Sequence, residues 1–230
     1  MLNKQIPTNQ QIANEFGFSS KHVSLMRINK DSVFQIYRES WLYRLICSSL
    51  THTQKDKLTY IIPTREQINN EFGDIKNKKS DTYSIALVDA WNLRQVFFKK
   101  LCDEDFKMSS DVNLNTNPFL GLNNTTKHIP INSQIKDSLN LSSSTLYSLK
   151  KDKRSLYVKA WLYKTILLFI PRNYQSFKEQ VPSDSQLVEE FGKTKQNYNS
   201  MRLKGTNLYE IYENVWNLEH NVFSKIIKCA

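Results

Sequence analysis

The sequence is poor in the residues that break helices and form tight turns. Its 230 residues include only five glycines and six prolines, which argues against a turn-rich all-β fold and favours a helical chain. No apolar run approaches the roughly 18 residues of a membrane-spanning helix, and the start, MLNKQIPTNQ, lacks the apolar core of a signal peptide. The three cysteines, Cys47, Cys102 and Cys229, are far apart and suit a reducing compartment. We therefore expect a cytoplasmic protein with no membrane partner.

Catalytic and cofactor-binding motifs are also missing from the sequence. The four histidines show no metal-ligand spacing, and the glycines are scattered singly, so no phosphate-cradling loop is present. The acidic runs at 103–105 and 189–190 are more typical of solvated surface than of a two-metal site. We expect a protein that is not an enzyme, with no cofactor, no metal and no small-molecule substrate.

The chain is basic along most of its length. Its net charge is +10 and its pI is about 9.4. Residues 1–102 carry 15 Lys and Arg against 9 Asp and Glu, residues 129–230 carry the same numbers, and residues 103–128 carry 2 against 4. Two separately basic halves favour a polyanionic partner. The alternative is that a genome rich in lysine codons produces the charge incidentally.

Residues 6–27, reading IPTNQQIANEFGFSSKHVSLMR, form the motif that the rest of the chain repeats. Thr8 followed three residues later by Gln11 predicts a helix opened by a capping box. Gly17 permits the positive φ of a tight turn, and Ser19 can cap a second helix. Apolar residues on both sides of this turn predict two short helices whose apolar faces close on each other.

This helix, glycine turn and second helix resemble the helix-turn-helix of the repressor-type DNA-binding superfamily, down to the small Ala13 four residues before the turn glycine. The resemblance implies that the outer face of the second helix reads DNA. On that face lie Ser20, Lys21, Ser24 and Arg27.

The motif occurs four times. Its openings are IPTNQQI at 6, IPTREQI at 62, IPINSQI at 129 and VPSDSQL at 181. The turn residues are Gly17, Gly73, Asn140 and Gly192, all of types that tolerate positive φ. The five apolar positions of the first copy are all kept in the third, four are kept in the fourth, and only two are kept in the second. The second half of copy two is therefore degenerate.

Each copy continues into a longer amphipathic segment that contains a tryptophan. These are Trp41, Trp91, Trp161 and Trp216. We expect these rings to pack in the cores rather than to stack on nucleic-acid bases. WLYRLI in the first copy matches WLYKTI in the third, and WNLRQVFFKKLC in the second matches WNLEHNVFSKIIKC in the fourth. The chain thus reads as a duplicated half.

These patterns predict an all-α fold of tandem three-helix helix-turn-helix units, arranged as a duplicated pair that acts as a dimer within one chain. The first half, 1–102, holds units at about 6–50 and 62–102; a polar linker spans 103–128; the second half, 129–230, holds units at about 129–170 and 181–230. A fully flexible linker of this length would span about 28 Å. That is close to the roughly 34–36 Å between half-sites one DNA turn apart.

The outward positions of the first copy, carried onto the others, define a polar or basic face. Arg and Lys suit guanine or phosphate, Asn and Gln suit adenine, and hydroxyls suit either. The run KKDKR, which follows the expected second helix of copy three, suits phosphates. Beyond the four residues of copy one, the expected DNA contacts are Lys76, Lys78 and Lys79 in copy two, Ser143, Ser144, Tyr147, Lys150, Lys151, Lys153 and Arg154 in copy three, and Lys195, Gln196, Asn199 and Arg202 in copy four.

The sequence therefore predicts a sequence-specific double-stranded DNA-binding protein that reads an imperfect repeat. Transcriptional regulation and plasmid or phage replication or partition are the processes that fit. Because the duplication already supplies two halves, a monomer suffices, although a homo-oligomer stays open. The alternative is a helical adaptor that binds other proteins through a relic helix-turn-helix scaffold, which degenerate copy two favours.

Overall fold

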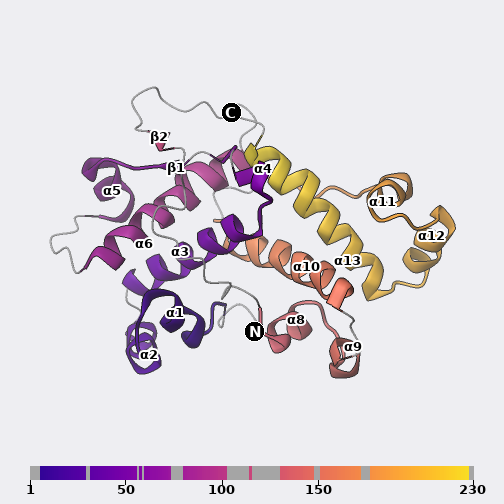
Figure 1. Cartoon of the computed structure of the whole chain (residues 1–230), viewed down its shortest axis with the longest axis horizontal. Coiled ribbons are helices and arrows are strands. Elements are labelled where there is room, and N and C mark those ends of the chain that lie inside the picture. Colours follow the sequence, from indigo (N-terminus) through magenta and orange to yellow (C-terminus); the bar gives the residue numbers. More distant parts are fainter. Residues whose placement is uncertain are drawn as a thin grey trace. The chain divides into compact units, whose positions relative to one another are not determined.

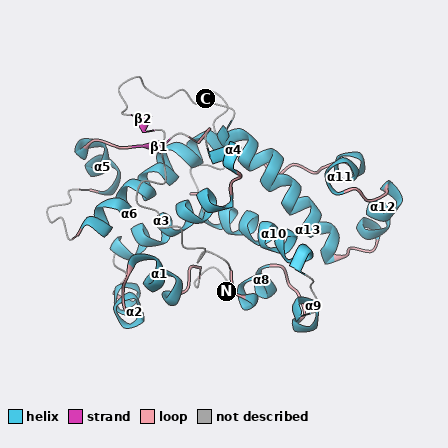
Figure 2. Cartoon of the chain, in the orientation of Figure 1, coloured by secondary structure: helices cyan, strands magenta, loops and turns pink. Residues whose placement is uncertain are grey.

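Helices make up nearly all of the regular structure in the computed structural model (Figure 2). It describes residues 6–29, 32–55, 57–58, 60–73, 80–102, 114–115, 130–147, 151–171 and 177–227. Within these ranges the only strands are two of two residues each, so the expected all-α class is confirmed. The chain divides into two compact units, Gln5–His128 and Ile129–Lys225, apart from the chain termini.

The first unit contains two long helical segments, each preceded by short helices (Figure 1). Its elements are α1 (Asn9–Phe16), α2 (Ser20–Ile28), α3 (Ser32–Ser49), α4 (His52–Lys55), β1 (Tyr60–Ile61), α5 (Arg65–Phe72), α6 (Asp81–Trp91), the π-helix η2 (Asn92–Phe98), α7 (Lys99–Cys102) and β2 (Leu114–Asn115). Helices α1 and α2 pack against each other and against α3, and α3 packs along α6.

From residue 130 onward the order of elements is similar. They are α8 (Asn132–Ser138), α9 (Ser143–Tyr147), α10 (Lys151–Phe169), α11 (Asp184–Phe191), α12 (Lys195–Leu203), α13 (Asn207–Trp216), the π-helix η4 (Asn217–Phe223) and α14 (Ser224–Ile227). Helix α10 packs along α13, as α3 does along α6. Both WNL segments begin a π-helix directly after the tryptophan.

Local sequence signals set the ends of the short helices. The backbone N–H of Gln11 donates to Thr8 Oγ1 at 3.2 Å, and Gln11 Oε1 accepts from the N–H of Thr8 at 2.8 Å. This confirms the predicted capping box, which α5 and α11 repeat. Gly17 has φ 72°, Asn140 has φ 50°, and Ser19 caps α2. The predicted turns are therefore present.

The tryptophans pack in the cores, as the sequence predicted. Trp41 and Trp161 are 1% and 0% exposed, and Trp91 and Trp216 are each 7% exposed. In the second unit Trp216 packs with Leu187 of α11. The rings therefore fill the space between the long helices and the short ones that pack on them.

The segment expected as a linker takes part in the fold of the first unit. Tyr60 pairs with Asn115 and Ile61 with Leu114 in an antiparallel register. The reach calculated for a fully flexible 103–128 segment therefore does not apply, because two of its residues are paired to β1.

Copy two departs from the motif after its turn. Ser80 caps α6 through the N–H of Tyr83, so these two residues open the long helix. Tyr83 is 5% exposed and its ring centre lies 6.0 Å from that of Tyr37. The register of the first copy puts Tyr83 at the position of Arg27, on the outward face, and this placement is wrong. Apolar packing against α3 outweighs the register that the first copy suggested.

Trp41→Ala and Trp161→Ala should each lower the free energy of unfolding by about 3–5 kcal/mol, because each change opens a large cavity in a core. Urea unfolding followed by circular dichroism measures the loss. Leu168→Ala is the control, since Leu168 lies on α10 but is 44% exposed, and it should change the stability by about 0.5 kcal/mol or less. An unchanged melting temperature together with weaker single-strand binding would show that the rings stack on bases.

Candidate nucleic-acid interface

The outward face of α2 carries the four residues that the sequence predicted there. Ser20 and Lys21 are exposed, and Ser24 and Arg27 are half-buried. Val23, which helix geometry places on the side opposite Lys21, is 0% exposed. Helix α2 therefore has a polar and basic side that faces solvent and an apolar side that is buried.

Hydrogen bonds connect this face to the first turn of α1. Asn9 Nδ2 donates to Ser24 Oγ at 2.7 Å, and Arg27 Nη1 donates to Asn9 Oδ1 at 3.3 Å. Ser20 Oγ donates to Gln10 Oε1 at 2.7 Å. The polar surface therefore extends across both helices, and Asn9 and Gln10 belong to it although the sequence analysis did not single them out.

Helix α12 presents the equivalent face in copy four. Lys195, Gln196, Asn199 and Arg202 are all exposed. Arg202 Nη2 donates to Asp184 Oδ2 at 3.2 Å and to Asn199 Oδ1 at 3.1 Å. The four predicted residues of this copy therefore lie together on one accessible surface.

The two arginines occupy the same place in their copies. Arg27 contacts Asn9, the first residue of α1, and Arg202 contacts Asp184, the first residue of α11. Each guanidinium is therefore held over the first turn of the preceding helix. The sequence pattern that could have revealed this is the Asn or Asp directly after each N-cap.

In copy three the structure describes the second helix, α9, as far as Tyr147. Ser143 and Ser144 are exposed, and Ser142 Oγ caps α9 by accepting from the N–H of Thr145 at 3.1 Å. The predicted Tyr147 is the last residue of α9. Some predicted contacts lie outside the described residues: Lys76, Lys78, Lys79 and Lys150, together with the side chains of Tyr147 and Lys151.

The basic run of copy three comes after α9, as the sequence predicted, and its described residues belong to the next helix. Lys151, Lys153 and Arg154 lie at the start of α10 as the structure describes it. Lys153 is exposed and Arg154 is half-buried.

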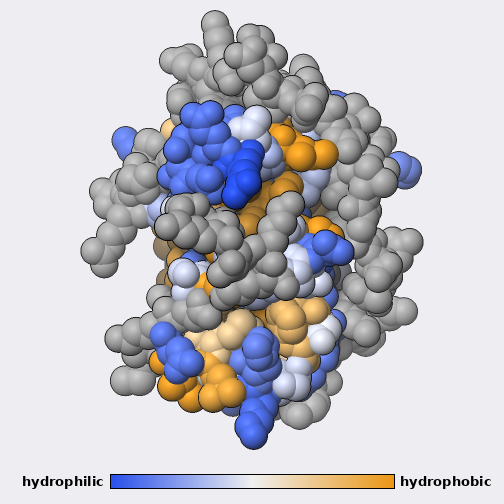
Figure 3. All heavy atoms as spheres, turned by 90° about the vertical axis from the view of Figure 1, so that its left-hand side faces the viewer, coloured by the Kyte–Doolittle hydropathy of each residue, from blue (hydrophilic) through white to orange (hydrophobic). Residues whose placement is uncertain are grey.

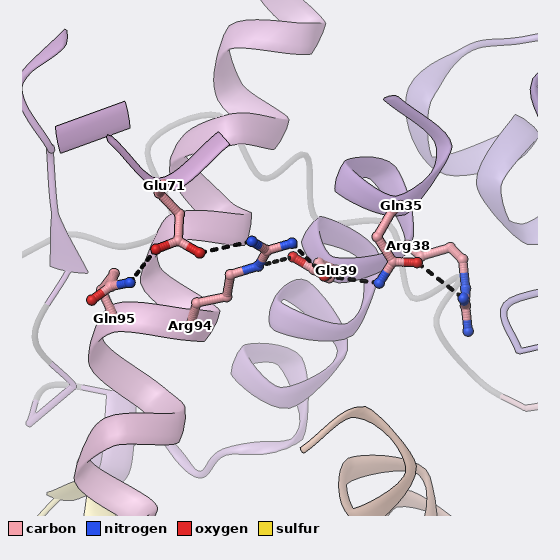
Figure 4. Close-up of polar contacts among 6 residues, drawn as sticks. All are labelled: Gln35, Arg38, Glu39, Glu71, Arg94 and Gln95. Carbon is pink, nitrogen blue, oxygen red and sulfur yellow. Dashed lines mark hydrogen bonds and ion pairs between the residues drawn. The ribbon is translucent and has the colours of Figure 1, made fainter. Parts of the chain in front are cut away.

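Two crossed ion pairs join the long helices of the first unit, and Figure 4 shows one of them, between Glu39 and Arg94. Glu39, two residues before Trp41, accepts from Arg94 Nε at 2.6 Å and Nη2 at 2.9 Å. Asp89, two residues before Trp91, accepts from Arg44 Nε at 2.7 Å. Each arginine lies three residues after a tryptophan. We call these contacts the crossed pairs, since each long helix supplies one acid and one arginine.

The same arginines also hold the short helices in place. Arg44 Nη1 donates to Glu15 of α1 at 2.7 Å, and its guanidinium lies 4.9 Å from the centre of the Phe16 ring. Arg94 repeats both contacts in α5, with Glu71 at 2.7 Å and with the phenylalanine ring that follows it. The position of α1, and with it the outward face of α2, therefore depends on Arg44.

The second unit repeats one of these pairs with other charges. Lys159, two residues before Trp161, donates to Glu219 at 2.7 Å, and Glu219 lies three residues after the other tryptophan. The position of this pair is therefore that of Glu39 and Arg94, with the polarity reversed. Lys164, three residues after Trp161, pairs with Glu210, which lies six residues before Trp216, so the second pair is not at the position of Asp89.

Two asparagines join the chain ahead of α5 and α11 to the π-helices. Asn92 accepts from the N–H of Ile61 at 2.9 Å and donates to its carbonyl at 2.8 Å. Asn217 makes the same two bonds with Gln180, at 3.0 and 2.8 Å. The repeated WNL was the sequence signal, but nothing in its local pattern identifies the backbone partner.

Asp89, the acid of one crossed pair, is buried and accepts hydrogen bonds from several side chains. It is 4% exposed, and Ser40 and Tyr60 also donate to it, at 2.8 and 3.3 Å. Burial raises the pKa of the Asp89 carboxyl, and Arg44 and the two hydroxyls oppose this shift without cancelling it.

No family model, curated protein or solved structure matches the chain. Within the described ranges, no group of three or more His, Cys, Asp or Glu side chains is placed to hold a metal ion. No helix in the same ranges is long and apolar enough to cross a membrane.

Replacing Arg44 with Met should lower the free energy of unfolding at pH 7 by about 3–5 kcal/mol, because Asp89 would stay buried without its cation. The folded-state pKa of Asp89 would then lie still further above the unfolded one. The folded variant would bind more protons than the unfolded chain, so its deficit against the wild type should shrink as the pH falls from 7 towards 4. Urea unfolding across this range measures it.

Lys164→Met is the matched control, since Lys164 also lies three residues after a tryptophan. The Lys164 and Glu210 side chains are 30% and 53% exposed, so the loss should be about 0–1 kcal/mol. Equal losses in the two variants, or a deficit of Arg44→Met that grows towards low pH, would contradict the described role of Arg44.

Proposed function

We propose that this chain binds double-stranded DNA in a sequence-specific manner, with α2 and α12 lying in major grooves. The observation that carries the proposal is the equivalence of these two helices. Each has nine residues, follows a capped helix and a glycine turn, and contains no acidic residue. Each also presents an arginine held by the first residue of the preceding helix. On this proposal both segments are helix-turn-helix motifs.

The chemistry of the two faces supports contacts to both bases and phosphates. Lys21 and Lys195 are exposed at the N-terminal part of their helices, and residues there contact base edges in docked helix-turn-helix proteins. Arg27 and Arg202 can donate in bidentate fashion to guanine, and Gln196 can pair with adenine. The side chains differ between α2 and α12, so the target is an imperfect repeat.

One chain supplies both recognition helices on this proposal, so it needs no second copy to bind two half-sites. The role is that of a regulator or a replication or partition factor that acts on DNA without chemistry. Proteins of this kind need sequence discrimination more than raw affinity.

Selection of bound sequences from a random duplex pool tests the proposal. We expect an enriched site with two related but unequal parts. The logarithm of its affinity should fall with the logarithm of salt concentration, with a slope of about −0.9 for each phosphate contacted. No enrichment, or an affinity that salt leaves unchanged, would exclude sequence-specific DNA binding.

Arg27→Ala and Arg202→Ala should each weaken binding to the selected duplex by about 1–3 kcal/mol and relax discrimination in a different part of it. Fluorescence anisotropy with single-base variants of the duplex measures both effects. Lys57→Ala is the control, because Lys57 is exposed and lies outside both helix pairs. It removes the same charge and should weaken all sequences slightly and equally. If the arginine variants weakened binding to all sequences equally, the two arginines would contact phosphates and not bases.

A further inference from the structure

Helices α2 and α12 both end in a large apolar residue that is open to solvent. Ile28 is 73% exposed and Leu203 is 78% exposed. Each is the last residue of its helix and directly follows the arginine of the polar face. A single exposed apolar residue is ordinary on a protein surface. Two at the same position of two equivalent helices are not explained by chance alone.

Helical geometry places these residues within the polar face rather than beside it. Lys21 and Ile28 are seven residues apart, close to two full turns, so they lie nearly in line along α2 and about 10 Å apart. Gln196 and Leu203 have the same relation on α12. The buried Val23 lies on the opposite side of α2. Both apolar side chains therefore point in the direction that the proposed DNA contacts take.

Helix α2 exposes more apolar surface than α12. Leu25 is 50% exposed and lies one turn before Ile28, whereas α12 has Ser200 at the equivalent position. In the face that Figure 3 shows, apolar atoms are exposed beside hydrophilic ones near the lower end.

The major groove of DNA offers one apolar group, the 5-methyl of thymine. An apolar protein partner would have to cover Lys21 and Arg27 on α2, or Gln196 and Arg202 on α12, whereas DNA would accept these groups. We propose that Ile28 and Leu203 contact thymine 5-methyl groups and so specify an A·T pair in each half of the target. This inference rests on the proposed function and adds the base that each helix end selects. Leu25 makes the half read by α2 the richer in thymine.

Uracil substitution tests the contact, because uracil differs from thymine only by the missing methyl. Each thymine of the selected duplex is replaced singly, and the affinity of the full chain is measured by anisotropy. At one or more positions in each half the affinity should fall about fourfold, the factor for burying one methyl-sized group. Ile28→Ala should lose a similar factor on the thymine duplex and become insensitive to uracil in its half only. Leu203→Ala should do the same in the other half.

Leu168→Ala is the control, since Leu168 is an exposed apolar residue of α10 outside both faces; it should keep full uracil sensitivity. Retained DNA binding with no uracil effect, or with uracil sensitivity unchanged in Ile28→Ala, overturns this inference and leaves the proposed function standing. A change in self-association of Ile28→Ala in sedimentation, without any uracil effect, assigns the residue to a protein contact and overturns it equally. Failure to select any duplex overturns the proposed function, and this inference falls with it.

Discussion

The crossed pairs between α3 and the α6–η2 helix are the constraint on which the first unit depends. A buried carboxylate must be paired or protonated, so Asp89 fixes the position of Arg44. Arg44 in turn reaches Glu15 and the Phe16 ring of α1. One guanidinium therefore sets both the packing of the long helices and the placement of the short pair that carries the outward face of α2.

The polarity of these pairs also affects which long helices can pack against each other. The first unit has an acid before each tryptophan and an arginine after it, whereas α10 has Lys159 and Lys164 at the two positions. If the α13–η4 helix packed against α3 in the same register, Glu219 would take the place of Arg94 and would oppose Glu39. Such a like-charge contact disfavours the exchange of long helices between the two units. The long helices of the two units are therefore similar in sequence position but differ in the charges that pair them.

Local patterns predicted the local structure, and long-range contacts escaped them. The capping box at Thr8, the turn at Gly17 and the burial of Trp41 follow from residue types at fixed spacings, and all are present. The bonds from Asn92 to Ile61 span 31 residues, and no periodicity identifies such a partner. The basic run at 151–154 follows α9 as predicted, but its charges gave no sign that it belongs to the long helix α10. The residues predicted to lie outward are exposed or half-buried in α2 and exposed in α12.

The central claim is that two helices of one chain lie in major grooves of the same duplex. Dimethyl sulfate protection on a selected duplex tests it most directly, because this reagent methylates guanine N7 in the major groove and adenine N3 in the minor groove. The account predicts two separate tracts of protected guanine N7, one for each helix, while adenine N3 in those tracts stays reactive. Protection of a single tract, or protection confined to adenine N3, would contradict it.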